Sequence, residues 1–217
     1  ESGCSQPGTL NHRLSQRLCL LPGQRLNKGA HGPMPRPPHR GKTPTRAEPR
    51  RVLTNAATTR LSPQSVEFII LSFEGPDLYS LIGGLGVRAT ELASTLAELG
   101  FRTRLYFLGD PQKAYYEEQI GGLLTYHRWC QWLSAQFPDG VYHGEDAKIN
   151  DYTASLPEHI LEQVIAPAAA RGRSVVVLAE EWHTTGAVIN LARSVLRAGL
   201  HERCLILWNA NNVFGFE

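Results

Sequence analysis

Residues 66–100 decide the fold: VEFIILSFEGPDLYSLIGGLGVRATELASTLAELG. The run Val66–Phe73 is β-prone and, apart from Glu67 and Ser72, apolar, which is typical of a strand buried on both faces. From Val87 to Leu99 apolar residues recur at spacings of three and four, which predicts an amphipathic helix ended by Gly100. A second strand is expected at Arg104–Leu108, so this stretch forms a βαβ unit.

The second half of the chain continues the alternation of strands and helices. Buried strands are expected at Val175–Ala179 and Cys204–Trp208, with a helix from Thr184 to Leu196 between them. Strands separated by helices indicate an α/β fold with a doubly wound, mainly parallel, Rossmann-like sheet.

The middle of the chain is less regular. Residues 123–133 fit either a strand or a short helix, and residues 137–151 form a predicted loop rich in Gly, Asp and Asn. The sequence Ser155-Leu156-Pro157-Glu158 has the pattern of a capping box, which predicts a helix beginning there and running to about Arg171.

Charge and composition divide the chain after residue 65. Residues 1–65 hold 11 Lys and Arg against two acidic residues, nine of the 14 prolines and no aromatic residue, whereas residues 66–217 carry a net charge of −7. A segment of the first kind buries too little apolar surface to offset its ordering entropy, so we expect a disordered basic leader at 1–65 and a folded domain at 66–217. Scattered arginines without aromatic residues argue against a nucleic-acid-binding arm.

The cysteines and the hydropathy of the chain indicate its cellular location and exclude some kinds of site. Cys4, Cys19, Cys130 and Cys204 show neither a CxxC pair nor metal-ligand spacing, which predicts free thiols, no metal and a cytoplasmic location. No apolar stretch approaches the length of a membrane span.

Candidate functional side chains follow the predicted strands. In open α/β sheets, ligands bind beyond the carboxyl ends of the strands. Carboxylates, an imidazole and amides gather at these positions within residues 66–217, and they are the candidate site residues: Glu74, Asp110, Glu180, Glu181, His183, Asn209 and Asn211.

The glycines before the first helix are the most informative segment. Gly83, Gly84 and Gly86 would let a ligand approach the backbone, and the helix start beyond them offers N–H groups suited to a phosphate or a sugar hydroxyl. Gly84-x-Gly86-x-x-Ala89 also fits the dinucleotide fingerprint of an NAD(P)-dependent oxidoreductase. In that fingerprint the glycines follow the strand at once, whereas here Glu74 to Ile82 intervene.

The order of three segments resembles the N-terminal half of GT-B glycosyltransferases, above all the glycogen/starch-synthase-like and family 4 retaining enzymes. Glu74-Gly-Pro followed by Gly83-Gly84-Leu85-Gly86 resembles their opening Gly-rich loop. The segment 176–184, VVLAEEWHT, is similar to their "VVHAHDWHT" stretch, and Leu207-Trp208-Asn209 stands where they have "T-x-HN".

The resemblance implies transfer of a hexose from a nucleotide sugar to a glucan or other sugar acceptor with retention of configuration, and it implies no metal or other cofactor. It makes the chain the acceptor-side domain, lacking a C-terminal donor domain and therefore inactive alone. Glu180, Glu181 and His183 then stand at the catalytic positions. The chain departs from the family pattern at Glu180, where a His is usual, and at Leu81, where a Lys is frequent.

Two further interpretations stay open. One is a non-catalytic Rossmann-like binding module that recruits a partner. The other concerns Trp129 and Trp132, which could form a stacking platform for a sugar ring, although two aromatic residues three apart more often lie in a core.

Overall fold

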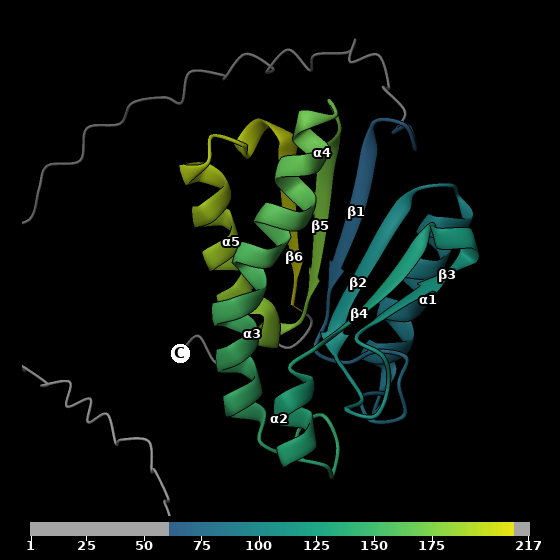
Figure 1. Ribbon diagram of the computed structural model, residues 1–217, viewed down its shortest axis with the longest axis vertical. Helices are drawn as coiled ribbons and strands as arrows, with labels where there is room; N and C mark the ends of the chain where they lie inside the picture. The colour runs from purple at the N-terminus through teal and green to yellow at the C-terminus, as the bar shows by residue number, and fades with distance from the viewer. Residues whose placement is uncertain (1–60, 211–217) are drawn as a thin grey trace, which may run out of the picture. The chain divides into compact units, whose positions relative to one another are not determined.

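The computed structural model describes residues 61–210. Within this range the chain forms a sheet in the order β3-β4-β2-β1-β5-β6 (Figure 1). All neighbouring strands are parallel except β3, which pairs antiparallel with β4. The strands are β1 Val66–Leu71, β2 Arg102–Leu108, β3 Tyr116–Gln119, β4 Leu124–Trp129, β5 Ser174–Glu180 and β6 Cys204–Asn209. The predicted mainly parallel α/β fold is confirmed.

Strand β1 lies at the centre of the sheet, as its mostly apolar sequence predicts. All of its residues are buried, and Ile69 pairs with Arg104 of β2 on one side and Val177 of β5 on the other. Helix α1 (Gly84–Glu98) connects β1 to β2 and packs through the small side chains of Ala89 and Ala93. Alanine at these positions lets the helix approach the sheet closely.

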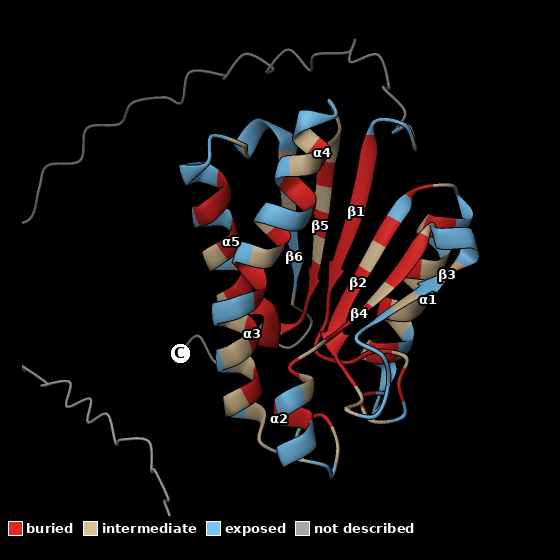
Figure 2. Cartoon of the chain, in the orientation of Figure 1, coloured by how far each residue is buried: buried red, intermediate tan, exposed pale blue. Residues whose placement is uncertain are grey.

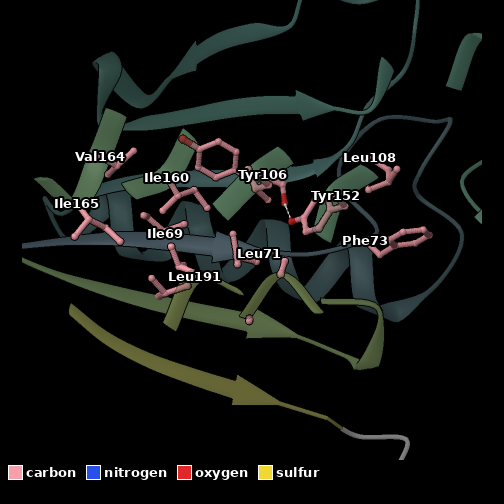
Figure 3. Packing of buried hydrophobic residues seen from close by; sticks show 14 of the residues in the cluster. Ile69, Leu71, Phe73, Tyr106, Leu108, Tyr152, Ile160, Val164, Ile165 and Leu191 are labelled. Atoms are coloured by element: carbon pink, nitrogen blue, oxygen red, sulfur yellow. Dashed lines mark hydrogen bonds between the residues drawn. The ribbon is translucent and has the colours of Figure 1, made fainter. Parts of the chain in front are cut away.

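Helices cover both faces of the sheet, which makes it doubly wound (Figure 1). Helix α1 covers one face. The other carries α3 (Glu145–Ile160), which continues through a π-helical turn at Leu161–Ile165 into α4 (Ala166–Ala170), and α5 (Thr185–Arg197). The larger core lies on this second face, where side chains of β1 and β2 meet those of α3 and α5 (Figure 3). Figure 2 shows the burial concentrated in the central strands.

The predicted helix start at the capping box Ser155–Glu158 is wrong, because helix α3 begins earlier in the chain. The helix begins at Glu145, after Gly144 in the left-handed conformation (φ +69°), so residues 145–151 of the predicted loop 137–151 are helical. Acidic residues in the first turn, Glu145 and Asp146, favour this start. Ser155 lies inside the helix and its hydroxyl donates to the carbonyl of Asp151 (2.7 Å) instead of capping an end.

Pro157 is tolerated in the interior of α3 because α5 donates a hydrogen bond to the backbone carbonyl that the proline leaves unbonded. A proline cannot donate to the carbonyl four residues earlier, here that of Thr153. The side-chain amide of Asn190 in α5 donates to this oxygen at 3.0 Å. The bond thus repairs the defect in α3 and ties α5 to it.

Two other differences concern segments that the sequence left open. Residues 124–129 form strand β4, and a short helix α2 (Gln131–Gln136) follows. Strand β3 was not expected, because its residues are polar and largely exposed.

Among the described helices none is both long and apolar enough to cross a membrane. The cytoplasmic location stays a prediction, and residues 1–60 of the predicted leader lie outside the described residues.

Candidate functional site

A cavity of about 360 Å³ opens beyond the carboxyl ends of β1 and β5. It is built by the segment after β1, the start of α1, the segment before α3 and the turn after β5. Its lining residues are Glu74, Gly84, Leu85, Arg88, Tyr142, Glu181, Trp182 and His183. This is the position where ligands bind in open α/β sheets.

Glu74 joins three walls of the cavity. Its Oε2 atom accepts hydrogen bonds from the backbone N–H groups of Gly83 and Gly86, both at 3.0 Å. Its Oε1 atom accepts a hydrogen bond from the hydroxyl of Tyr142. Helix α1 has no acidic residue in its first turn and no side-chain cap from Gly83, so Glu74 supplies the anion that its N-terminus favours. Two of the N–H groups expected to face a ligand are therefore already bonded.

The glycines of this segment have different structural roles. A Cβ atom on Gly86 would lie 3.1 Å from the carbonyl oxygen of Gly75 and 3.3 Å from Cβ of Glu74, so this position needs a glycine for close packing. A Cβ atom on Gly84 would meet nothing within 4 Å. Gly84 therefore leaves space in the cavity rather than allowing a close contact within the chain.

Glu181 occupies a strained turn at the end of β5. Its φ of +65° is rare for a residue with a side chain, and such strain is frequent at ligand sites. Its backbone carbonyl accepts from the indole N–H of Trp208 at 3.0 Å, which holds the turn against β6. Its Oε2 atom is buried and has no hydrogen-bond partner among the described residues.

His183 is fixed by stacking and by one carboxylate. Its ring stacks on Phe73 at 4.5 Å and on Trp182 at 4.0 Å between centroids. Its Nε2 atom lies 2.8 Å from Oε1 of Glu145. Burial lowers the pKa of His183, and although Glu145 opposes this effect, the pKa stays below its ordinary value. The ring is therefore mostly neutral near pH 7, and its Nδ1 atom has no partner in the described part of the chain.

Glu180 lies behind the cavity rather than in it. Its carboxylate is buried and pairs with the guanidinium of Arg88, which does line the cavity. The side-chain amide of Asn209 donates to the same carboxylate at 3.1 Å. Glu180 thus fixes Arg88 and neutralises its charge.

The wall that carries Tyr142 is anchored by a buried lysine. The Nζ atom of Lys148, in α3, donates to the carbonyl oxygens of Gly140, Val141 and His143 at 2.6–3.0 Å. The hydroxyl oxygen of Tyr79 lies 2.6 Å from the same Nζ atom, as a fourth oxygen around its three N–H groups. The lysine side chain has no exposed surface. These bonds hold the segment before α3, and with it Tyr142, against the cavity.

The predicted site residues do not all lie in the cavity. Glu74, Gly84, Glu181 and His183 line one cavity, while Gly83 and Gly86 reach it only through Glu74. Glu180 and Asn209 form the network behind Arg88. Asp110 lies apart, where its backbone N–H donates to Asp77, and Asn211 lies outside the described residues. Whether these residues bind a ligand stays a prediction.

Sequence reasoning missed several groups of the cavity. Arg88 lies within the predicted helix Val87–Leu99, four residues after Gly84, and this spacing by itself does not mark it as a site residue. Tyr142 and Glu145 lay in the segment predicted as a loop. The clustering of Tyr142, His143 and Glu145 there was the available signal. Within residues 61–210 no group of His, Cys, Asp and Glu side chains could hold a metal ion.

Comparisons with known proteins give a distant structural likeness. No protein-family model matches the chain, and no curated protein does. Among solved structures, the catalytic domain of starch synthase IV from Arabidopsis thaliana, bound to ADP and acarbose, is similar over 68% of this chain with 12% sequence identity and a TM-score of 0.49. This chain covers 34% of that domain, about a third of its length. Neither a family nor a ligand follows from a likeness at this level.

Proposed function

We propose that this domain is the acceptor-side half of a retaining GT-B glycosyltransferase. Its substrates would be a nucleotide-sugar donor and a glucan or other sugar acceptor, and no cofactor would take part. The observation that carries the proposal is that two separate segments resembling the family's motifs contribute Glu74, Gly84, Glu181 and His183 to one cavity. The donor would bind mainly to another domain.

The polar groups of the cavity suit hydroxyls better than phosphates. Glu74 and Glu181 present carboxylates, and the guanidinium of Arg88 is already paired with Glu180. A phosphate would need the N–H groups that Glu74 holds, and it would face the same negative charges. Sugar hydroxyls donate hydrogen bonds to carboxylates and to a neutral imidazole. Glu181 and His183 would therefore hold acceptor hydroxyls, and Glu180 would act by positioning Arg88.

The same contacts disfavour a nicotinamide cofactor. In the dinucleotide fold the pyrophosphate sits on the N–H groups at the start of the first helix. Here Glu74 occupies this position at the start of α1. An eleven-residue segment, Ser72 to Ile82, also separates β1 from the glycines.

Calorimetric titration tests the proposal. The chain is titrated separately with maltotriose, ADP-glucose and NAD⁺. We expect maltotriose to bind, and Glu181→Gln and His183→Ala each to weaken it about tenfold, the effect of one lost hydrogen bond to a charged or well-placed group. The matched variants Glu202→Gln and His201→Ala change exposed residues at the opposite end of the sheet and should leave binding unchanged. NAD⁺ binding without a response to the sugar would contradict the proposal.

A further inference from the structure

A second cavity of about 330 Å³ lies between the end of β4, α2 and α3. It shares no lining residue with the first cavity. We call it the aromatic cleft, and the residues that define it are Tyr115, Trp129, Gln131, Trp132, Asp151 and Ser155. Three large aromatic side chains thus surround a space that also presents a carboxylate and an amide.

Two of the three aromatic side chains of the cleft are exposed rather than buried in a core. Trp132 is 59% exposed and Tyr115 is 42% exposed. In the same helix, Leu133 and Ser134 are the residues buried against the domain, so α2 does not need Trp132 for its packing. Exposed aromatic side chains that gather around one cavity are characteristic of a binding surface.

Trp129 is held in one orientation. Its indole N–H donates to the hydroxyl of Ser155 at 2.7 Å. Its ring lies against His159, with 4.8 Å between centroids, and against Tyr115 at 5.8 Å. A ring fixed in this way loses little conformational entropy when a ligand packs on it.

The turn between the two tryptophans is unusual. Cys130 adopts the left-handed conformation, with φ of +54°, although it carries a side chain. Its thiol is buried and donates to the carbonyl of Lys148. This residue reverses the chain from β4 into α2 and brings Trp129 and Trp132 to the same cleft. Uncommon backbone geometry at such a position is frequent at ligand sites.

Two polar side chains of the cleft present oxygen atoms that can accept hydrogen bonds. The amide nitrogen of Gln131 donates to the carbonyls of Asp110 and Lys113, which fixes the side chain while its Oε1 atom accepts no hydrogen bond from the described residues. The carboxylate of Asp151 lines the same space. The cleft therefore combines flat apolar surfaces with hydroxyl acceptors.

We propose that the aromatic cleft is a second carbohydrate site, which binds one hexopyranose unit of a glycan. One face of a pyranose carries mostly C–H groups and packs on Trp132 beside Trp129, while the hydroxyls at its rim donate to Asp151 and Gln131. A phosphate or nucleotide fits this chemistry poorly because the cleft offers no unpaired cation: the guanidinium of Arg128 is held by Asp77 and Glu117. The inference rests on the cleft itself and does not require the proposed function of the first cavity.

The four tryptophans provide a test that separates the two cavities. Trp129 and Trp132 belong to the aromatic cleft, whereas Trp182 lines the first cavity and Trp208 contacts Glu181 beside it. The whole chain is labelled with ¹⁵N-tryptophan and titrated with maltoheptaose and, separately, with cellohexaose. We expect at least one of these glycans to shift the indole resonances of Trp129 and Trp132.

Substitutions then measure the contribution of the cleft. Trp132→Ala should weaken the glycan binding reported by the Trp129 indole about tenfold or more. Because Trp132 is exposed, this variant should fold, which the unchanged resonances of Trp182 and Trp208 would verify. Tyr116→Ala is the matched control: Tyr116 is 44% exposed on β3 and lies outside the cleft. It should leave glycan affinity unchanged.

Three outcomes would overturn the second site. The first is that neither glycan shifts Trp129 or Trp132; shifts confined to Trp182 and Trp208 would in that case still support the proposed function of the first cavity. The second is equal affinity in Trp132→Ala and the parent chain. The third is a shift of Trp129 and Trp132 that depends on protein concentration without sugar, which would assign the cleft to contacts between copies of the chain.

Discussion

The Oε2 atom of Glu74 accepts a hydrogen bond from the backbone N–H of Gly86 across 3.0 Å. The chain thereby places its own anion at the start of α1, where an external phosphate would otherwise bind. This one contact separates the Gly-rich segment of this protein from a preformed phosphate cradle. It also links the helix to the wall of the cavity, because the same carboxylate accepts from Tyr142.

Glu74→Ala should destabilise the domain by about 1–2 kcal/mol, because it removes a cap and a favourable charge at a helix N-terminus. Urea unfolding followed by circular dichroism measures the change. Glu91→Ala, an exposed acidic residue within the same helix, serves as the control and should have a much smaller effect. An equal loss in both variants would show that the two bonds to Glu74 contribute nothing specific.

The same substitution should create a weak anion site. With the carboxylate gone, the N–H groups of Gly83 and Gly86 lose their acceptor and become available to phosphate. Millimolar inorganic phosphate should therefore raise the melting temperature of Glu74→Ala more than that of the parent chain. Equal stabilisation of both would mean that phosphate binds elsewhere.

The sequence predicts the parts of the fold that depend on local patterns of apolar residues. Strands β1, β2, β5 and β6 and helices α1 and α5 were expected from apolar runs and periodicity. Strand β3 was not, because Tyr116–Gln119 is polar and becomes a strand only through pairing with β4. The start of α3 was misplaced for a related reason: Pro157 suggests a first turn, and only the distant Asn190 makes it acceptable inside a helix.

The candidate site likewise contains some residues that local sequence patterns reveal and others that only tertiary contacts bring to the cavity. Glu74, Glu181 and His183 could be found because each follows a predicted strand, and strand ends of a parallel sheet meet at one edge. Tyr142 and Glu145 reach the cavity through a segment whose course is set by Lys148 and three carbonyl oxygens. That Glu74 would bond the glycine N–H groups is likewise a matter of tertiary geometry, which no spacing in the sequence reveals.

Asp77→Asn should lower stability by about 3–5 kcal/mol, because it breaks a buried ion pair. Asp77 and Arg128 form a two-pronged contact, with Nε–Oδ2 at 2.7 Å and Nη2–Oδ1 at 3.1 Å, and both side chains are 1% exposed. Urea unfolding measures the loss. Asp139→Asn is the control, since Asp139 is 82% exposed. A loss below about 1 kcal/mol in Asp77→Asn, the size expected for an exposed ion pair, would contradict the expectation.

The Asp77 pair should also make the domain sensitive to acid. Burial by itself raises the pKa of Asp77, but hydrogen bonds from Arg128 and Lys113 outweigh burial and hold the pKa below its ordinary value of 3.8. The folded state therefore binds this proton less readily than the unfolded state, so the contribution is present above pH 3.8 and is lost as pH falls through the folded pKa. Between pH 5 and pH 2 the parent chain should lose more stability than Asp77→Asn.

Gly186→Ala should destabilise the contact between α5 and α3, although alanine is the better helix former. A Cβ atom at Gly186 would lie 2.6 Å from Oγ1 and 3.2 Å from Cβ of Thr153, so a rotamer change cannot clear it. Overpacking of this kind costs about 1–3 kcal/mol, against a gain of about 1 kcal/mol in helix propensity. The double variant Thr153→Ala/Gly186→Ala should recover most of the loss. Additive effects in this thermal-unfolding cycle would sink the steric explanation.

His183 should titrate below its ordinary pKa of 6.5, because burial disfavours the charged ring. The Nε2–Glu145 contact of 2.8 Å opposes burial, so Glu145→Gln should move the midpoint still lower. Because the unfolded chain then binds this proton more readily, stability should fall as pH drops below 6.5. The NMR titration of the His183 Cε1–H resonance measures both midpoints. A midpoint that rises in Glu145→Gln would mean that the carboxylate does not stabilise the imidazolium.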